Sequence, residues 1–264
     1  MRRYFKIIVA FLAVIAVAGI CVSFLTSLTG SDTDKTKPAE PQKNNPPIET
    51  KYISFLGDSI TTYEGYSNSA NNNSTTAGNG VYYTASKLGV NETWWYQTMK
   101  ATGMKLCVNN SWDGGRVTDT KPGITSGIAR ASELHNDVLN ITPDVIVVYI
   151  GTNDLANGIN VSDFEIGYEE MLNVIDSEYP GADVYCCTIL PESRNVNKAD
   201  ELISYNETIR NLADQHNAKI IDFATEITDW DYTVHTFVDG SLRVHPTAEG
   251  MSKLSDVAIR EIKG

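Results

Sequence analysis

Residues 145–154 read VIVVYIGTND, an unbroken run of apolar side chains that ends abruptly in small and polar residues. A strand with one exposed face alternates apolar and polar residues, whereas a strand covered on both faces of a parallel sheet is apolar throughout. Four further segments share this continuous character: YISFLG (52–57), MKLCVNN (104–110), ADVYCCTIL (182–190) and AKIIDF (218–223). The sequence therefore predicts five buried strands.

Helical patterns separate the later strands. Residues 162–179 begin with Ser162 and Glu165 at the spacing of a capping box. One face of this segment carries Phe164, Tyr168, Met171, Leu172 and Ile175. Residues 200–216 and the segment after Pro246 carry similar apolar stripes. Strands alternating with helices predict an α/β fold with an open parallel sheet, and we expect residues 50–264 to form one domain.

Polar residues follow the first three predicted strands, where an open α/β sheet binds its ligands. Ser59 comes directly after the first strand, Gly114 lies beyond the second, and Asn153 follows the third. A serine becomes a nucleophile when a base lies within hydrogen-bond reach. A backbone N–H at a small residue and an asparagine amide are suitable donors to an oxyanion. Each residue by itself fits an ordinary turn equally well.

Taken together, four short blocks resemble the SGNH/GDSL hydrolase family. They are GDS at 57–59, N-x-S-x-x-G from Asn109 to Gly114, G-x-N-D at 151–154 and His-Pro at 245–246. The resemblance covers essentially residues 50–264. It implies a flavodoxin-like three-layer α/β/α sandwich with a five-stranded parallel sheet in the order 2-1-3-4-5.

The resemblance also implies a role for each matching residue. Ser59 is expected to be the nucleophile and His245 the general base. The oxyanion hole is expected to consist of the N–H groups of Ser59 and Gly114 and the side chain of Asn153. The implied reaction is acyl transfer to water, which requires no metal and no cofactor.

The acid that would orient His245 is not settled by the sequence. The family usually places it three residues before the histidine, where this chain has Leu242. Asp239, six residues before His245, reaches the ring if the intervening segment bulges. Alternatively, a backbone carbonyl orients the ring in a Ser–His dyad, or Glu249 substitutes from the first turn of the last helix. The predicted triad is Ser59, His245 and Asp239.

Composition narrows the classes of ligand. The formal net charge of the chain is −12, and the first thirty residues contain Arg2, Arg3 and Lys6 but no acid. A domain with this much negative charge is poorly suited to nucleic acid, and no nucleic-acid partner is expected.

The remaining histidines and the cysteines are expected to be structural. His135, His216 and His235 lie outside the four blocks. No spacing suggests a metal site. Cysteines 107, 186 and 187 lie in apolar runs, which favours buried free thiols.

The N-terminal residues predict a membrane attachment. Residues 7–28 contain no charge and are long enough to span a bilayer, whereas the apolar core of a cleaved signal peptide is usually shorter. We therefore expect residues 1–30 to be a signal anchor, with cleavage and secretion as the alternative. Residues 31–49 are expected to be a proline-rich linker, and the domain at 50–264 to face the extracytoplasmic side.

A long polar segment lies between Ser59 and the second strand and is expected to border the active site. Its tyrosines 63, 66, 82 and 83 are candidates for stacking on sugar rings. Alternatively, the segment is a solvated surface loop, and Trp94 and Trp95 at its end open a helix and pack in the core.

The leading hypothesis is an extracytoplasmic serine esterase that acts on short acyl esters. The expected substrate is a small-molecule or polysaccharide ester, in particular acetyl groups on carbohydrate. Because Leu242 departs from the family pattern, a non-catalytic surface binding module is the alternative. A flavodoxin-like cofactor carrier shares the fold, but the chain lacks the glycine patterns of phosphate-binding loops. Fold alone does not decide among these functions.

Overall fold

The computed structural model describes residues 50–67, 80–118 and 126–264 of the 264-residue chain. The predicted anchor at 1–30 and linker at 31–49 lie outside the described residues. Within the described ranges, no helix is both long enough and apolar enough to cross a membrane. The described residues belong to one compact unit, which runs from Ile48 to Gly264.

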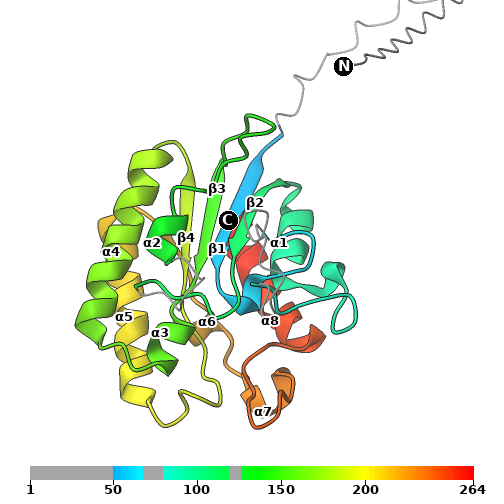
Figure 1. Ribbon diagram of the computed structural model, residues 1–264, viewed down its shortest axis with the longest axis vertical. Helices are drawn as coiled ribbons and strands as arrows, with labels where there is room; N and C mark the ends of the chain where they lie inside the picture. Colours follow the sequence, from blue (N-terminus) through cyan, green and yellow to red (C-terminus); the bar gives the residue numbers. More distant parts are fainter. Residues whose placement is uncertain (1–49, 68–79, 119–125) are drawn as a thin grey trace, which may run out of the picture. The chain divides into compact units, whose positions relative to one another are not determined.

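The five apolar runs form a single sheet in which every neighbouring pair of strands is parallel (Figure 1). The strands are β1 (Tyr52–Gly57), β2 (Lys105–Ser111), β3 (Val145–Tyr149), β4 (Asp183–Cys187) and β5 (Lys219–Ile221). Their order is β2-β1-β3-β4-β5. Both the α/β class and the order 2-1-3-4-5 are therefore confirmed.

Helices cover both faces of the sheet and complete three layers (Figure 1). On one face, α1 (Trp94–Thr102) packs against α8 (Ala248–Lys263). On the other face, α4 (Val161–Glu178) packs against α5 (Ala199–Gln215) and α2 (Gly127–Arg130). The remaining helical turns are η1 (Ser59–Thr61), η2 (Val90–Glu92), α3 (Thr152–Ala156), α6 (Phe223–Glu226) and α7 (Tyr232–His235).

Aromatic side chains fix the position of α1 against the sheet. Trp94 and Trp95 are fully buried, as expected if they open a helix and pack in the core. The ring of Trp94 meets that of Phe55 on β1 edge to face, with ring centroids 5.6 Å apart. Burial of one such side chain contributes about 1.5–3 kcal/mol. This packing holds β1, and with it the turn that carries Ser59, in a rigid frame.

The three described cysteines are free and buried, as predicted. Burial raises the pKa of Cys186 to about 12, so this thiol stays protonated at neutral pH.

The predicted capping box of α4 is wrong by two residues. The helix begins at Val161, and its N-cap is Asn160, whose side-chain oxygen accepts a hydrogen bond from the N–H of Asp163 at 2.9 Å. Ser162 already lies inside the first turn. Asparagine is at least as good a cap as serine, and here it precedes the first helical residue. The predicted apolar face of α4 is confirmed, because Phe164, Tyr168, Met171, Leu172 and Ile175 are all buried.

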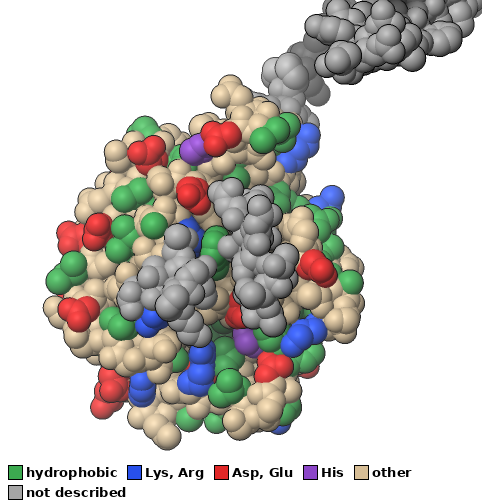
Figure 2. Space-filling model, in the orientation of Figure 1, with side chains coloured by type: hydrophobic (Ala, Val, Ile, Leu, Met, Phe, Trp, Pro, Cys, Tyr) green, Lys and Arg blue, Asp and Glu red, His purple; other side chains and the backbone are tan. Residues whose placement is uncertain are grey.

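Acidic side chains are scattered over the face drawn in Figure 2, with lysine and arginine side chains between them. The negative net charge is therefore spread over that face and not gathered at one place.

Gly250 allows α8 to begin next to the segment that precedes it. A Cβ atom at this position would overlap the carbonyl oxygen of His235 and lie 3.0 Å from Cβ of Pro246. We predict that Gly250→Ala destabilises the fold by about 1–3 kcal/mol despite the better helix propensity of alanine. Gly181→Ala is the matched control, because a Cβ there meets nothing within 4 Å, and should change stability by less than about 0.5 kcal/mol. Equal unfolding midpoints in denaturant for the two variants would contradict this account.

Candidate active site

Ser59 lies where β1 ends and the short helix η1 begins. Asp58 caps this turn, since its side chain accepts a hydrogen bond from the N–H of Ile60 at 2.9 Å. Asp58 is fully buried, and burial raises the pKa of its carboxyl to about 7. Ser59 is itself 4% exposed. The sheet therefore presents the serine hydroxyl on a rigid, capped turn at the carboxyl end of a central strand.

His245 reaches Ser59 from the segment that enters α8. Its Nε2 lies 3.0 Å from Oγ of Ser59, which is hydrogen-bond distance for proton transfer. This segment is held by antiparallel pairing, because the N–H of Phe237 donates to the carbonyl of His245 at 2.8 Å. The N–H of Thr247 likewise donates to the carbonyl of His235 at 2.9 Å. The structure thus brings together two residues that lie 186 positions apart.

Asp239 lies on the other side of the imidazole, with its Oδ2 3.0 Å from Nδ1 of His245. A tight hairpin places it there. Asp239 and Leu242 exchange both backbone hydrogen bonds, at 2.9 and 3.0 Å, around a two-residue turn in which Gly240 has a φ of 63°. Because the two residues are cross-strand partners, Asp239 lies beside the position where the family usually has its acid. Of the three arrangements considered from the sequence, the structure has the one with Asp239.

Glu249 does not face this ring. Its Oε1 lies 3.5 Å from Nε2 of His235, a buried histidine outside the Ser59–His245 pair. A backbone carbonyl is not needed to orient His245 either, because Nδ1 already faces the Asp239 carboxylate.

The three donors that the resemblance implies for an oxyanion hole all lie just beyond the carboxyl ends of β1, β2 and β3. Within the described part of the chain, the N–H groups of Ser59 and Gly114 have no hydrogen-bond acceptor. Asn153 donates one N–H to the carbonyl of Gly115 at 3.0 Å, and an amide carries two such protons. A second N–H of Asn153 therefore remains for a ligand, and these groups are suited to an oxyanion hole.

Two buried side chains, Asp154 and Arg130, hold the segments on either side of Gly114. Asp154 accepts hydrogen bonds from the N–H of Val117 at 2.9 Å and of Thr118 at 3.3 Å. Arg130 donates through Nη1 to the carbonyls of Gly57 and Asn110 at the ends of β1 and β2. Burial lowers the pKa of Arg130 to about 10, so it stays charged at neutral pH. Nothing in the sequence indicated this role for Arg130, because the residue lies on a short helix outside the four blocks.

Arg194 is a further site residue that sequence reasoning missed. Its Nη1 donates to Oδ1 of Asn153 at 3.0 Å, and its Nε lies 2.8 Å from Oε1 of the buried Glu192. The contact fixes the amide of Asn153 so that its nitrogen faces Gly115. Arg194 follows β4, so applying the strand-end rule to the fourth strand as well would have found it.

The expected sugar-stacking tyrosines prove to be largely packed. Tyr63 and Tyr83 are buried, and their hydroxyls donate to the carbonyls of Leu88 and Pro246. Tyr82 is half-buried and lies flat on the imidazole of His245, with centroids 3.4 Å apart and planes at 19°. Tyr66 is 42% exposed. The expectation of sugar contact is therefore wrong for Tyr63 and Tyr83, because their rings face the interior.

The surroundings of His245 favour its neutral form. Burial lowers the pKa of the imidazole below its usual value, while the hydrogen bond to Asp239 opposes this effect in part. Burial alone would raise the pKa of Asp239, but the hydrogen bonds from Tyr82 and His245 outweigh it and lower the pKa. At neutral pH the pair therefore consists of a neutral base and an ionised acid.

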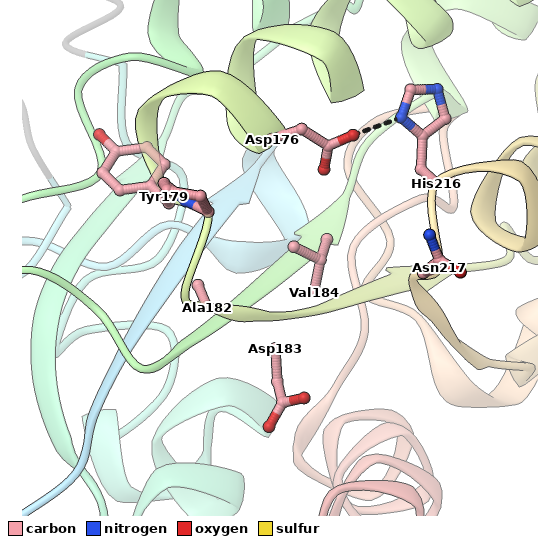
Figure 3. Close-up of a pocket in the computed structure, with 8 residues that line it drawn as sticks. Asp176, Tyr179, Ala182, Asp183, Val184, His216 and Asn217 are labelled. Carbon is pink, nitrogen blue, oxygen red and sulfur yellow. Dashed lines mark hydrogen bonds and ion pairs between the residues drawn. The ribbon is translucent and has the colours of Figure 1, made fainter.

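A cavity of about 320 Å³ lies at the opposite, amino-terminal end of β4 and β5 (Figure 3). Asp176, Tyr179 and His216 line it, and Nδ1 of His216 lies 2.6 Å from Oδ2 of Asp176. This cavity is separate from the Ser59 site, which lies at the carboxyl ends of the strands. Within the described residues, no group of three or more potential metal-ligating side chains occurs.

Comparison with known proteins shows which family and which proteins this chain is similar to. Residues 55–253 match the model of the GDSL-like lipase/acylhydrolase family. A multidomain esterase of Ruminococcus flavefaciens is 25% identical over 150 residues, which are 54% of this chain but only 18% of that protein.

Two solved structures show the same fold. One, described as a GDSL-like lipase from Bacteroides ovatus, is 24% identical with a TM-score of 0.60, covering 81% of this chain and 99% of that chain. A carbohydrate acetylesterase family member from Sinorhizobium meliloti is 16% identical with a TM-score of 0.58, covering 81% and 98%.

The site predicts the pH dependence of its chemistry. His245 must be neutral to accept a proton from Ser59, and its pKa is lowered from the ordinary value of 6.5. We predict that kcat/KM for ester hydrolysis falls on the acid side with a midpoint below pH 6.5, because burial disfavours the imidazolium. Circular dichroism over the same pH range separates this limb from unfolding. A midpoint above 6.5 with the fold intact would show that His245 is not the titrating base.

Proposed function

Because the chain belongs to the GDSL-like lipase/acylhydrolase family, we propose that it is a serine esterase that removes short acyl groups, in particular acetyl groups, from carbohydrate. The observation that carries this proposal is the continuous set of contacts from Ser59 Oγ to His245 Nε2 and from His245 Nδ1 to Asp239 Oδ2, each 3.0 Å.

The proposed reaction follows from these contacts. Ser59 Oγ attacks the ester carbonyl while Nε2 of His245 takes its proton. The Asp239 carboxylate holds the Nδ1 proton and stabilises the imidazolium that forms. The negative charge on the former carbonyl oxygen is received by the N–H groups of Ser59 and Gly114 and by Nδ2 of Asn153. His245 then protonates the leaving alcohol, and a water molecule activated by the same residue releases the acid.

The choice of carbohydrate as the alcohol part rests on similarity and composition. One structural neighbour is described as a member of a carbohydrate acetylesterase family, and the curated relative is a multidomain esterase. Asn, Ser, Thr and Tyr dominate residues 62–84, next to the nucleophile, and Glu64 is their single charged residue. A lipase would instead be expected to surround its site with a broad apolar surface.

An enzyme is favoured over a non-catalytic binding module. Leu242 stands at the usual position of the family acid, but its cross-strand partner Asp239 contacts His245.

We also propose that the domain faces the extracytoplasmic side, tethered through residues 7–28, which contain no charge. Protease treatment of intact cells is the direct test. The domain should be digested without lysis, whereas protection until lysis would contradict an outward orientation.

The catalytic proposal predicts acetate release from a chromogenic acetyl ester and from acetylated xylan by the full chain. Ser59→Ala should reduce turnover by about four orders of magnitude or more, because the nucleophile is lost. Esters of eight or more carbons should be hydrolysed at least about tenfold less efficiently than acetyl, because the segment after Ser59 is polar in composition and supplies no apolar run for a long acyl chain. Undiminished activity in Ser59→Ala, or a preference for long acyl chains, would overturn the proposal.

A further inference from the structure

Asp239 lies on an element that cannot hold it firmly by itself. Its neighbours in the hairpin, Val238, Gly240, Ser241 and Leu242, are all exposed, and the turn contains only two residues. A carboxylate on an exposed turn is free to rotate towards water, and it would then leave His245 without a partner. The orientation of Asp239 must therefore be fixed by groups outside the hairpin.

Two side chains from the polar segment after Ser59 supply these contacts. The hydroxyl of Tyr82 donates to Oδ2 of Asp239, the same oxygen that faces His245. Nζ of Lys87 lies 3.4 Å from Oδ1 of Asp239. The lysine side chain is 38% exposed, so this ion pair is screened by water and contributes less than the tyrosine.

The ring of Tyr82 also fixes the imidazole. It stacks on His245 at a centroid distance of 3.4 Å, while Nζ of Lys87 lies 3.8 Å from the centroid of the same tyrosine ring. Two groups this close to one ring must lie on opposite faces, because on the same face they would overlap. Tyr82 is thus sandwiched between His245 and Lys87, and its faces are not available to a sugar ring.

Tyr82 and Tyr83 are in turn attached to the segments that carry the other site residues. The N–H of Tyr82 donates to Oγ1 of Thr62 at 2.9 Å, and that hydroxyl donates to the carbonyl of Ser59 at 2.8 Å. The hydroxyl of Tyr83 donates to the carbonyl of Pro246 at 2.8 Å. One dipeptide therefore connects the serine turn, the histidine segment and the hairpin.

We propose that Tyr82 is a positioning residue for the Asp239–His245 pair, in which its hydroxyl orients the carboxylate and its ring orients the imidazole. The proposal rests on the esterase function proposed above and extends it by a residue that acts through Asp239 and His245. Burial, together with the hydrogen bond and charge of Asp239, raises the pKa of the phenol, so the hydroxyl remains a donor across the working pH range.

The first test is Tyr82→Phe, which keeps the stacked ring and removes the hydroxyl. We expect kcat for the acetyl ester to fall about tenfold, as for the loss of one hydrogen bond to a charged group, with KM changed less than about twofold. Tyr96→Phe is the matched control, because within the described residues its hydroxyl makes no hydrogen bond, and it should retain parental kcat. Parental kcat in Tyr82→Phe would overturn the proposal.

A double-mutant cycle separates positioning from a general effect on folding. If the hydroxyl acts through Asp239, Tyr82→Phe should cost about nothing in an Asp239→Ala background. An equal cost in both backgrounds would show that Tyr82 stabilises the fold and does not position the acid.

A titration of His245 by NMR gives a readout that does not depend on turnover. In Tyr82→Phe the Asp239 carboxylate is no longer held against the ring and interacts less with the imidazolium, so the pKa of His245 should fall further below its ordinary value. Asp113 and Arg194, the other charged groups that act on His245, are unchanged in this variant. In Asp239→Ala the same substitution should leave that pKa unmoved.

The two proposals therefore fail in different ways. Absence of ester hydrolysis in the parent would overturn the esterase function, while the NMR titration would still test Tyr82. An unmoved His245 pKa in Tyr82→Phe, with the fold intact, would overturn the positioning role alone.

Discussion

The contact between Nδ1 of His245 and Oδ2 of Asp239, 3.0 Å long, is the interaction on which the proposed chemistry depends. A neutral imidazole carries one proton on either of two nitrogens, and only the tautomer with Nδ1–H leaves Nε2 free to accept a proton from Ser59. The carboxylate selects that tautomer and then stabilises the charged ring. The contacts of Tyr82 position this pair, and the proposed oxyanion donors receive the charge that it helps to create.

The parallel sheet explains how distant residues meet. Because all five strands point the same way, the residues that follow them gather along one edge, and Ser59, Gly114 and Asn153 follow β1, β2 and β3. Arg194, which follows β4, fixes the amide of Asn153. The proposed base and acid, His245 and Asp239, come instead from the hairpin segment that leads into α8. The site is therefore rigid on the sheet side and depends on side-chain contacts on the hairpin side.

Local patterns in the sequence predicted the strands and the apolar faces of the helices, and they placed the four blocks at the ends of strands or before the last helix. They could not decide among the partners of His245, because the spacing from Asp239 departs from the family pattern and a two-residue hairpin is visible only in backbone pairing. They also made Tyr82 and Tyr83 candidates for stacking on sugar rings, because the number of tyrosines in a polar segment does not show which rings face inward. Arg130 and Arg194 act through carbonyl and amide oxygens that come close only after folding.

The most direct test of this account is the turnover of Asp239→Asn on an acetyl ester, measured beside Glu249→Gln at a pH where His245 is neutral. The substitution keeps the shape of the side chain and removes its charge. We expect Asp239→Asn to lose about two to four orders of magnitude in kcat, because an amide does not stabilise the imidazolium, while Glu249→Gln stays within about twofold of the parent. Near-parental turnover in a folded Asp239→Asn variant would contradict the account and favour a Ser59–His245 dyad.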